Sequence, residues 1–335
     1  MQFVTLDFET YYDKDYTLRK LSTSEYIRDK RFEAISCSIK IDKRKPFCYF
    51  GFDDISSALK KIDWTAAVLL CHHTQFDGLI LSHHFKTVPA RYACTMSMAR
   101  ALHPKSERNR LEDVAVHYNV VNKLTMPDFK GMHLKDIPKP MRKEITVYNN
   151  GDVESCYQAY QAMVVGFPPP ELDLIDITVR MFADPVLKVD LPLAKAELKA
   201  EQERKAASIL ASGCEIDTLS SNPKFVAELV KLGVDVPMKP SPSIADKMIP
   251  AIAKADEDFQ ALLTHPDPKV VTLVEGRLAA KSTIGESRAH RMILSGSGGK
   301  KLPIYYNYAM AHTLRWSGGD KFNPQNFKQA KKVGG

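Results

Sequence analysis

Two carboxylates stand two residues apart near the N-terminus, at Asp7 and Glu9. They follow an apolar run at residues 3–6, which predicts that both lie at the end of a buried strand. Side chains at positions i and i+2 of a strand point to the same face, so the two carboxylates should converge. Two like charges held together cost stability, and a divalent cation between them removes that cost. Taken alone, this spacing more often marks a strand that ends in acidic residues at a loop.

Two more acids could join this pair. Asp77 comes after the apolar run 66–71, which predicts a central strand buried on both faces, and it lies where a helix begins. A helix N-terminus favours an acid, so simple capping also explains Asp77. Asp152 lies on a predicted helix at 141–164, four residues after Tyr148, so these two side chains share a face. The acids form a site only if the fold brings them together.

The elements that must position these acids follow from the hydrophobic pattern. Before residue 166 the pattern predicts a three-strand meander, a central strand and five helices, which is an α/β arrangement. The predicted strands span 3–6, 34–41, 47–52 and 66–71. One predicted helix begins at 78–81, and the others span 55–62, 96–102, 111–118 and 141–164. Glycine and proline interrupt the pattern at 166–170, and we expect a domain boundary there. Beyond it the pattern predicts helices at 171–182, 192–212, 224–232 and 269–294, and a short strand at 186–189.

Length and composition describe an ordinary globular protein of about two domains. The chain has 335 residues, of which 44% are hydrophobic and 26% are charged. No apolar run approaches the ~20 residues of a membrane span, and the N-terminus lacks the pattern of a signal peptide. The cysteines lack C-x-x-C spacing, which argues against a zinc site built on them and favours reduced thiols in a cytoplasmic protein, in the host cytoplasm if the protein is viral. They stand at positions 37, 48, 71, 94, 156 and 214.

Positive charge is concentrated in the last fifth of the chain. Residues 269–335 contain 12 Lys/Arg and 3 Asp/Glu, a net charge of +9. Because the whole chain carries +7, residues 1–268 carry −2. A basic C-terminal part is typical of a protein that binds a polyanion such as nucleic acid, although a solvated basic face would have the same composition.

The three acidic segments together resemble a known family. Asp7-x-Glu9, Phe76-Asp77 and Tyr148-x-x-x-Asp152 resemble the three motifs of the proofreading 3′–5′ exonucleases, over about residues 1–165. The resemblance implies a ribonuclease H-like domain, in which helices flank a mixed central sheet. It implies that Asp7, Glu9, Asp77 and Asp152 hold two Mg²⁺ (or Mn²⁺) ions for phosphodiester hydrolysis at DNA 3′ ends. It also implies that Tyr148 orients the attacking water.

Two positions depart from this family pattern. His73 stands where an asparagine is usual, four residues before Asp77. Cys94 stands where relatives often carry an aspartate. The first departure concerns a contact near the DNA 3′ end, and neither affects the four acids.

The second half of the chain resembles family A DNA polymerases of the bacteriophage type. The resemblance rests on segments 171–176, 180–182, 281–288, 311–318 and 323–326. It implies that residues 166–301 form a mainly helical thumb and residues 302–335 the start of the palm. The DNA contacts that it implies are Lys281, Ser282, Thr283, Arg288, Thr313, Arg315, Gln325 and Asn326. Leu314 departs from the family, which usually has a glycine there.

The resemblance stops before the catalytic palm and fingers of a polymerase. It therefore implies that this chain cannot polymerise alone and is either a truncated polymerase or one half of a split one, with a second chain supplying palm and fingers. The implied substrates are a single-stranded DNA 3′ end and a primer–template duplex. Two alternatives stay open, a stand-alone 3′–5′ exonuclease and a catalytically silent DNA-binding module of a replication complex. We expect residues 302–335 to be mobile, because they have little apolar periodicity.

Overall fold

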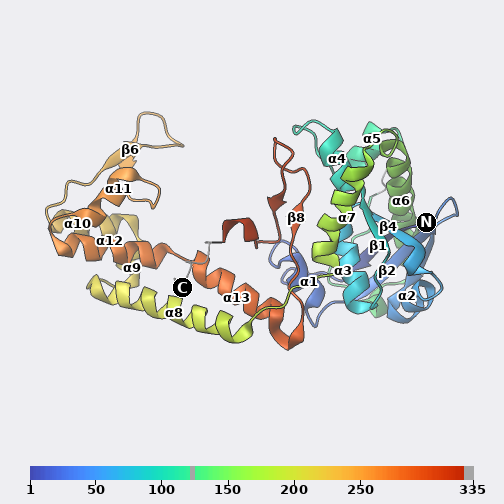
Figure 1. The fold of residues 1–335 in the computed structure, drawn as a ribbon, viewed down its shortest axis with the longest axis horizontal. Helices are drawn as coiled ribbons and strands as arrows, with labels where there is room; N and C mark the ends of the chain where they lie inside the picture. Colours follow the sequence, from blue (N-terminus) through green and yellow to red (C-terminus); the bar gives the residue numbers. More distant parts are fainter. Residues whose placement is uncertain (121–124, 328–335) are drawn as a thin grey trace, which may run out of the picture. The chain divides into compact units, whose positions relative to one another are not determined.

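The computed structural model describes residues 1–120 and 125–327, and the chain divides into two compact units (Figure 1). Unit 1 contains Met1–Lys188 and the residues from Gly299 onward, and unit 2 contains Val189–Gly298. The chain therefore leaves unit 1 once and returns to it. This division falls later in the sequence than the boundary expected at 165–166.

A five-stranded mixed sheet forms the centre of unit 1. Its strands are β1 (Gln2–Thr10), β2 (Ala34–Ile41), β3 (Phe47–Phe50), β4 (Ala67–Cys71) and β5 (Arg91–Cys94). Their order is β3-β2-β1-β4-β5, and β1 is antiparallel to β2 and parallel to β4. The predicted meander and central strand are thus confirmed. The pairing of β1 with β4 ends at Thr5, so the acidic end of β1 extends beyond β4.

The helices of unit 1 cover this sheet. They are α1 (Thr23–Arg28), α2 (Gly51–Leu59), α3 (Thr74–His84), α4 (Thr95–Leu102), α5 (Leu111–His117), α6 (Lys139–Met163) and α7 (Pro169–Ala183). Helix α7 packs against α3 and β5. It approaches α3 closely because Gly78 has no side chain, and a Cβ there would lie 2.9 Å from the Cβ of Ala183. This packing keeps α7 in unit 1, so the prolines at 168–170 start a helix and do not separate the two units.

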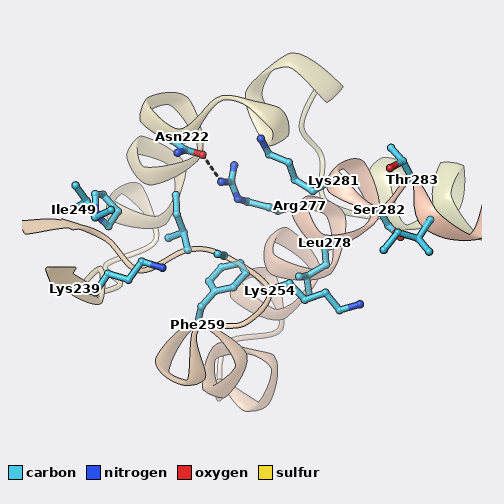
Figure 2. A pocket seen from close by; sticks show the side chains of 14 residues that line it. Asn222, Lys239, Ile249, Lys254, Phe259, Arg277, Leu278, Lys281, Ser282 and Thr283 are labelled. Carbon is cyan, nitrogen blue, oxygen red and sulfur yellow. Dashed lines mark hydrogen bonds between the residues drawn. The ribbon is translucent and has the colours of Figure 1, made fainter. Parts of the chain in front are cut away.

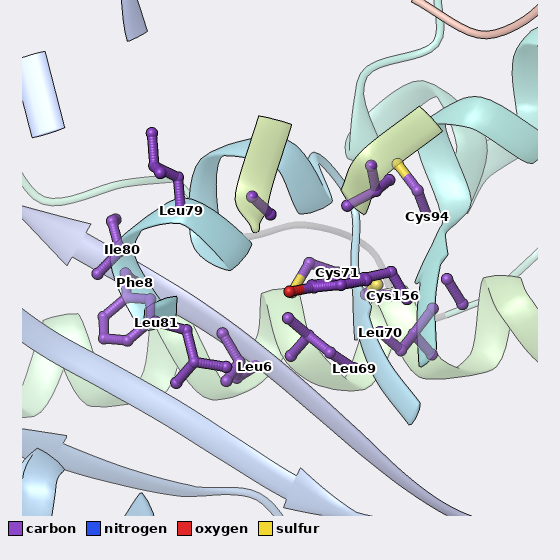
Figure 3. Close-up of a cluster of buried hydrophobic side chains, with 14 of the residues drawn as sticks. Leu6, Phe8, Leu69, Leu70, Cys71, Leu79, Ile80, Leu81, Cys94 and Cys156 are labelled. Atoms are coloured by element: carbon purple, nitrogen blue, oxygen red, sulfur yellow. The ribbon is translucent and has the colours of Figure 1, made fainter. Parts of the chain in front are cut away.

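Strand β1 directs apolar and acidic side chains to opposite faces. Leu6 and Phe8 are 1% and 4% exposed, and Figure 3 shows them beside the α3 residues Leu79–Leu81. The Phe8 ring also stacks on Phe85, with ring centroids 5.6 Å apart. Burial of each such side chain contributes about 1.5–3 kcal/mol, which fixes the register of the strand. The alternation therefore leaves Asp7 and Glu9 on the face that α6 covers.

Unit 2 is mainly helical and has a core of its own. Its helices are α8 (Leu191–Ala211), α9 (Ile216–Ser220), α10 (Asn222–Lys231), α11 (Glu257–Ala261), α12 (Pro268–Lys281) and α13 (Ile284–Gly296), and a two-stranded ribbon pairs β6 (Met238–Pro240) with β7 (Met248–Pro250). Phe225, Leu229, Phe259 and Val274 are fully buried in this core. The helices expected at 192–212 and 224–232 are confirmed.

Two expected elements of this region differ from the structure. The single helix expected at 269–294 is two helices, α12 and α13, because Ser282 and Thr283 take non-helical conformations between them. Serine and threonine hydroxyls compete for backbone hydrogen bonds, which favours helix ends over helix interiors. The strand expected at 186–189 is absent from the described residues, since Val186 is 72% exposed and only a single backbone bond, from Leu302 N–H to the Leu187 carbonyl, joins the segment to another.

Residues 302–327 pack onto unit 1. Tyr305 and Tyr308 are 7% and 6% exposed and belong to the core of that unit. The short strand β8 (Tyr306–Asn307) pairs with β9 (Ser317–Gly318). This packing differs from the mobility expected for the segment, because isolated aromatic residues bury surface without the spacing of a strand or helix. Residues 328–335 of the expected palm segment lie outside the described residues.

Two further expectations concern membranes and cysteines. In the described part of the chain, the helices are too short or too polar to serve as membrane spans. All six cysteines are free thiols, and five of them are buried. The structure therefore agrees with reduced cysteines that contribute to packing.

Candidate active site

Three of the four predicted acids meet on the α6 face of the sheet. Asp7 and Glu9 come from the end of β1, and Asp152 comes from the middle of α6. One carboxylate oxygen from each lies within 4.8 Å of the others. Asp152 is only 4% exposed, whereas Asp7 and Glu9 are partly exposed. The predicted convergence of Asp7 and Glu9 on one face, with Asp152 joining them, is therefore observed.

A buried asparagine holds one of these carboxylates. Asn149 of α6 donates through Nδ2 to Asp7 Oδ2 at 2.6 Å and to the Asp7 backbone carbonyl at 3.2 Å. Its Oδ1 accepts from the Ser36 hydroxyl of β2 at 3.4 Å. Asn149 is fully buried, so its side chain is fixed between β1 and β2. It fixes the orientation of the Asp7 carboxylate relative to α6.

Asp77, the fourth predicted acid, contacts the same end of β1 from helix α3. It lies in the first turn of α3, and its Oδ1 accepts from the Phe8 backbone N–H at 3.1 Å. That N–H is available because β4 no longer pairs with this part of β1. Burial raises the pKa of Asp77 to about 7. Asp77 is not part of the three-acid cluster, but it is bonded to the residue between Asp7 and Glu9.

Tyr148 stands beside the cluster, one helical turn before Asp152. The pKa of its hydroxyl is raised, first by burial and then by the negative charges of Asp152 and Glu9. The hydroxyl therefore keeps its proton near neutral pH and serves as a hydrogen-bonding group. Tyr148 also lines a cavity of about 570 Å³ together with residues 125–127 and Lys143, Glu144 and Val147. The cavity gives this side of the site room for a ligand.

His73, which lies four residues before Asp77 in the sequence, is hydrogen-bonded to the C-terminal segment. Its Nε2 forms a hydrogen bond with the Tyr305 hydroxyl at 2.5 Å. Gln75 donates in parallel to the Tyr306 carbonyl at 3.3 Å. Burial, with a smaller effect of Arg100, lowers the pKa of His73 to about 4. The imidazole is therefore neutral in the folded chain at physiological pH.

This lowered pKa predicts a pH-dependent loss of stability. Below the ordinary histidine pKa of about 6.5 the unfolded chain gains a proton that the folded chain does not bind until about pH 4. The unfolding free energy should fall by up to about 3 kcal/mol over this interval because of His73. Urea denaturation of wild type and His73→Asn at several pH values isolates this contribution, because the other groups titrate in both. Parallel curves for the two proteins would contradict the prediction.

Four of the predicted DNA-binding residues lie in unit 2. Lys281, Ser282 and Thr283 line a cavity of about 410 Å³ at the break between α12 and α13 (Figure 2). Arg288 lies further along α13. Arg277 lines the same cavity, is 3% exposed and donates to Asn222 Oδ1 at 2.6 Å and to the Leu219 carbonyl at 2.7 Å. Lys254 adds a further cation, whereas Lys239 is paired with Asp256 at 2.5 Å. The cavity thus combines positive charge with two hydroxyls.

The other four predicted DNA-binding residues lie in the C-terminal segment of unit 1. Thr313 and Arg315 are exposed in the connection between β8 and β9. Gln325 and Asn326 are exposed in a short 3-10 turn, Pro324–Asn326. Leu314 has φ of +59°, a left-handed conformation that glycine adopts without strain. A glycine at this position would therefore relieve backbone strain.

Asn149 is the site residue that the sequence analysis missed. It precedes Asp152 by three residues and so shares its face of α6. That spacing was the available signal, but an asparagine within a helix carries no metal-ligand pattern of its own. Its role depends on β1 and β2 lying beneath α6, which the local sequence does not encode.

Comparison with known proteins finds similarity to solved structures only. No protein-family model matches the chain, and a search of curated proteins finds no match. Among solved structures, however, the chain shares its fold with a DNA polymerase domain. That structure is the POL domain of Pol1 from M. smegmatis in complex with DNA primer-template and dNTP, with a TM-score of 0.59 and 14% identity. The alignment covers 99% of this chain and 53% of the Pol1 chain, so this chain spans about half the length of that structure.

Structures of NrnC from Brucella melitensis also match in part. Two of them, the second described with bound Mg²⁺, each have a TM-score of 0.40, with 13% and 14% identity. Each alignment covers 54% of this chain and 83% of the NrnC chain.

Proposed function

We propose that this chain is the N-terminal part of a family A DNA polymerase of the bacteriophage type and carries a metal-dependent 3′–5′ proofreading exonuclease. The observation that carries the proposal is the meeting of Asp7, Glu9 and Asp152 beside Tyr148. The exonuclease is assigned to residues 1–165 as a ribonuclease H-like domain, residues 166–301 to the thumb, and residues 302–335 to the start of the palm. The fold shared with a polymerase domain is consistent with this assignment.

The donor set fits a hard divalent cation. Three carboxylates offer oxygen ligands only, which suits Mg²⁺ or Mn²⁺. Asp7, Glu9 and Asp152 would hold one ion. Asp77, which accepts a hydrogen bond from the Phe8 N–H between Asp7 and Glu9, would be the fourth ligand of a two-ion site. Bound ions supply charge stabilisation to the phosphodiester and lower the pKa of water.

The chain's own residues have separate roles in this reaction. Asn149 orients the Asp7 carboxylate, because it donates to Asp7 Oδ2. Tyr148 retains its proton, so its hydroxyl orients the attacking water and does not act as a base. Water adds to phosphorus at the terminal linkage and releases a proton, the bond from phosphorus to the 3′ oxygen breaks, and that oxygen takes up a proton, so one water is consumed for each bond broken. The cavity beside Tyr148 is the proposed space for the 3′ nucleotide.

DNA and a second chain are the proposed partners. Lys281, Ser282, Thr283 and Arg288 are proposed to bind duplex phosphates, and cationic side chains around their cavity support this. Thr313, Arg315, Gln325 and Asn326 are proposed to contact the primer–template. A second polypeptide is proposed to supply palm and fingers, and the complex is proposed to act in the cytoplasm, which is that of the host cell if the protein is viral.

The decisive experiment is digestion of a single-stranded DNA labelled at its 5′ end. With Mg²⁺ or Mn²⁺ we expect a ladder of products that shortens from the 3′ end, and with a chelator we expect none. A strand whose last linkage is a phosphorothioate should be digested more slowly than the unmodified strand. Intact DNA after incubation with high concentrations of folded protein and metal would rule out the exonuclease and favour a silent DNA-binding module.

Asn149 offers a graded test of the same site. Groups that orient metal ligands typically contribute 10–100-fold to metal affinity or activity. We expect Asn149→Ala to raise the Mg²⁺ concentration for half-maximal digestion about 10–100-fold, and excess metal should restore most of the rate. Asn150→Ala is a neighbouring control, because Asn150 bonds to Ser38 and not to Asp7. An unchanged metal requirement in Asn149→Ala would separate this residue from the site.

A further inference from the structure

A second cluster of metal-ligand side chains lies in unit 1, apart from the acidic site. His103 follows the end of α4, His117 is the last residue of α5, and Glu107 lies in the loop between these helices. One ligand atom from each residue lies within 4.8 Å of the others. Among the described residues, this is one of two groups with such a geometry.

The distances in this cluster approach those of a bound metal. Glu107 Oε2 lies 3.4 Å from His117 Nδ1 and 3.9 Å from His103 Nδ1. Two ligands of a tetrahedral zinc ion, each about 2.0–2.1 Å from the metal, are about 3.3 Å apart. Small side-chain adjustments would therefore bring these atoms to ligand distance, and Glu107 and His117 are exposed enough to make them.

The surroundings of His103 are those of a fixed ligand. Its side chain is buried, and its Nε2 forms a hydrogen bond with the Tyr118 hydroxyl at 3.1 Å, which leaves Nδ1 toward Glu107. A partner on the second ring nitrogen is typical of metal-binding histidines.

A neighbouring charged residue of the loop is engaged elsewhere. Arg110 is paired with Glu112 at 2.5 Å and Asp113 at 2.9 Å, so its charge is engaged away from Glu107.

We propose that His103, Glu107 and His117 form a binding site for a divalent transition metal, with Zn²⁺ as the favoured ion. Two imidazoles and one carboxylate suit Zn²⁺ better than Mg²⁺, which prefers oxygen ligands alone. The ion would join the two ends of the 103–117 segment. That segment is already held to the end of β4 by a 2.8 Å bond between His72 Nε2 and the Asn109 carbonyl. The site is therefore a structural clamp on the loop beside the sheet edge, independent of the proposed exonuclease.

The test is to titrate the metal-free chain with Zn²⁺ and to measure binding by isothermal titration calorimetry. The background variant Asp7→Asn/Asp152→Asn removes two acids of the other cluster, so that Zn²⁺ binding there does not obscure the result. We expect one equivalent of Zn²⁺ to bind to this background protein. We also expect Glu107→Gln and His117→Ala to weaken binding at least tenfold each. Both residues are exposed, so these variants should fold, whereas a change at buried His103 is less informative.

A matched control and a second readout complete the experiment. His290→Ala changes an exposed histidine of unit 2 and should leave Zn²⁺ binding unchanged. Hydrogen exchange should show that Zn²⁺ protects the amides of residues 103–117 in the background protein and not in His117→Ala. Absence of Zn²⁺ binding, or binding that is equally tight in Glu107→Gln and His117→Ala, would overturn the proposal. Either result leaves the exonuclease assignment untouched, because that is measured with Mg²⁺ and DNA.

Discussion

Asp7→Asn should reduce the rate of 3′-end digestion by at least about 10³-fold and leave the fold intact. The change removes one negative charge from the group of three carboxylates that is proposed to hold the metal. Stabilisation by a catalytic metal amounts to several kcal/mol, and about 4 kcal/mol corresponds to 10³ in rate. An asparagine oxygen can still accept the hydrogen bond that Asn149 donates to Asp7 Oδ2, so local packing should be retained. Single-turnover digestion of end-labelled DNA measures the rate.

The unfolding free energy of Asp7→Asn should be measured alongside its digestion rate. In the metal-free protein, the three acids repel one another, so the loss of one charge should leave the unfolding free energy unchanged or slightly raised. A catalytic loss without a stability loss distinguishes a chemical role from a structural one. Asp54→Asn is the matched control, because Asp54 is an exposed acid in the first turn of α2. Activity within a few-fold of wild type in Asp7→Asn would refute the assignment of this acid.

The part of the site that was predictable is the part that local geometry determines. The spacing of Asp7 and Glu9 on a strand places both on one face whatever the strand packs against. The spacing of Tyr148 and Asp152 does the same for a helix. The sheet follows from the same kind of signal, because β4 is a short apolar run and β2 alternates.

What the sequence did not reveal depends on packing between distant segments. The bonds from Asn149 to Asp7 and from Asp77 to the Phe8 N–H join residues 142 and 69 positions apart. The compact units divide at Lys188/Val189, later than the boundary expected at 165–166, because Gly78 allows α7 to pack closely on α3 within unit 1. The break between α12 and α13 is a local feature, but the strong periodicity on both sides of Ser282 concealed it.

Replacement of Tyr305 should release the C-terminal segment from unit 1. Tyr305 packs edge-on against Phe182 of α7 with ring centroids 4.9 Å apart, and its hydroxyl bonds to His73. Backbone bonds from Ile304 to the Met181 carbonyl, and from Gly319 to the Tyr305 carbonyl, depend on its position. Replacement of a buried aromatic residue by alanine costs about 3–5 kcal/mol. We therefore expect Tyr305→Ala to detach residues 304–327 by local unfolding while the five-stranded sheet stays folded.

Hydrogen exchange and limited proteolysis measure this release. In Tyr305→Ala the amides of Ile304 and Gly319 should exchange at least about 100-fold faster, since 3 kcal/mol corresponds to more than two powers of ten. Tyr305→Phe keeps the ring and loses only the hydrogen bond to His73, so it should cost about 1 kcal/mol and change exchange less than tenfold. Amides in β4 should be unaffected in both variants. Equal exchange at Ile304 in Tyr305→Ala and wild type would mean that other contacts hold the segment. The expected outcome would instead make the hydrogen bond between His73 and Tyr305, which are 232 positions apart, part of the attachment that holds the C-terminal segment to the rest of unit 1.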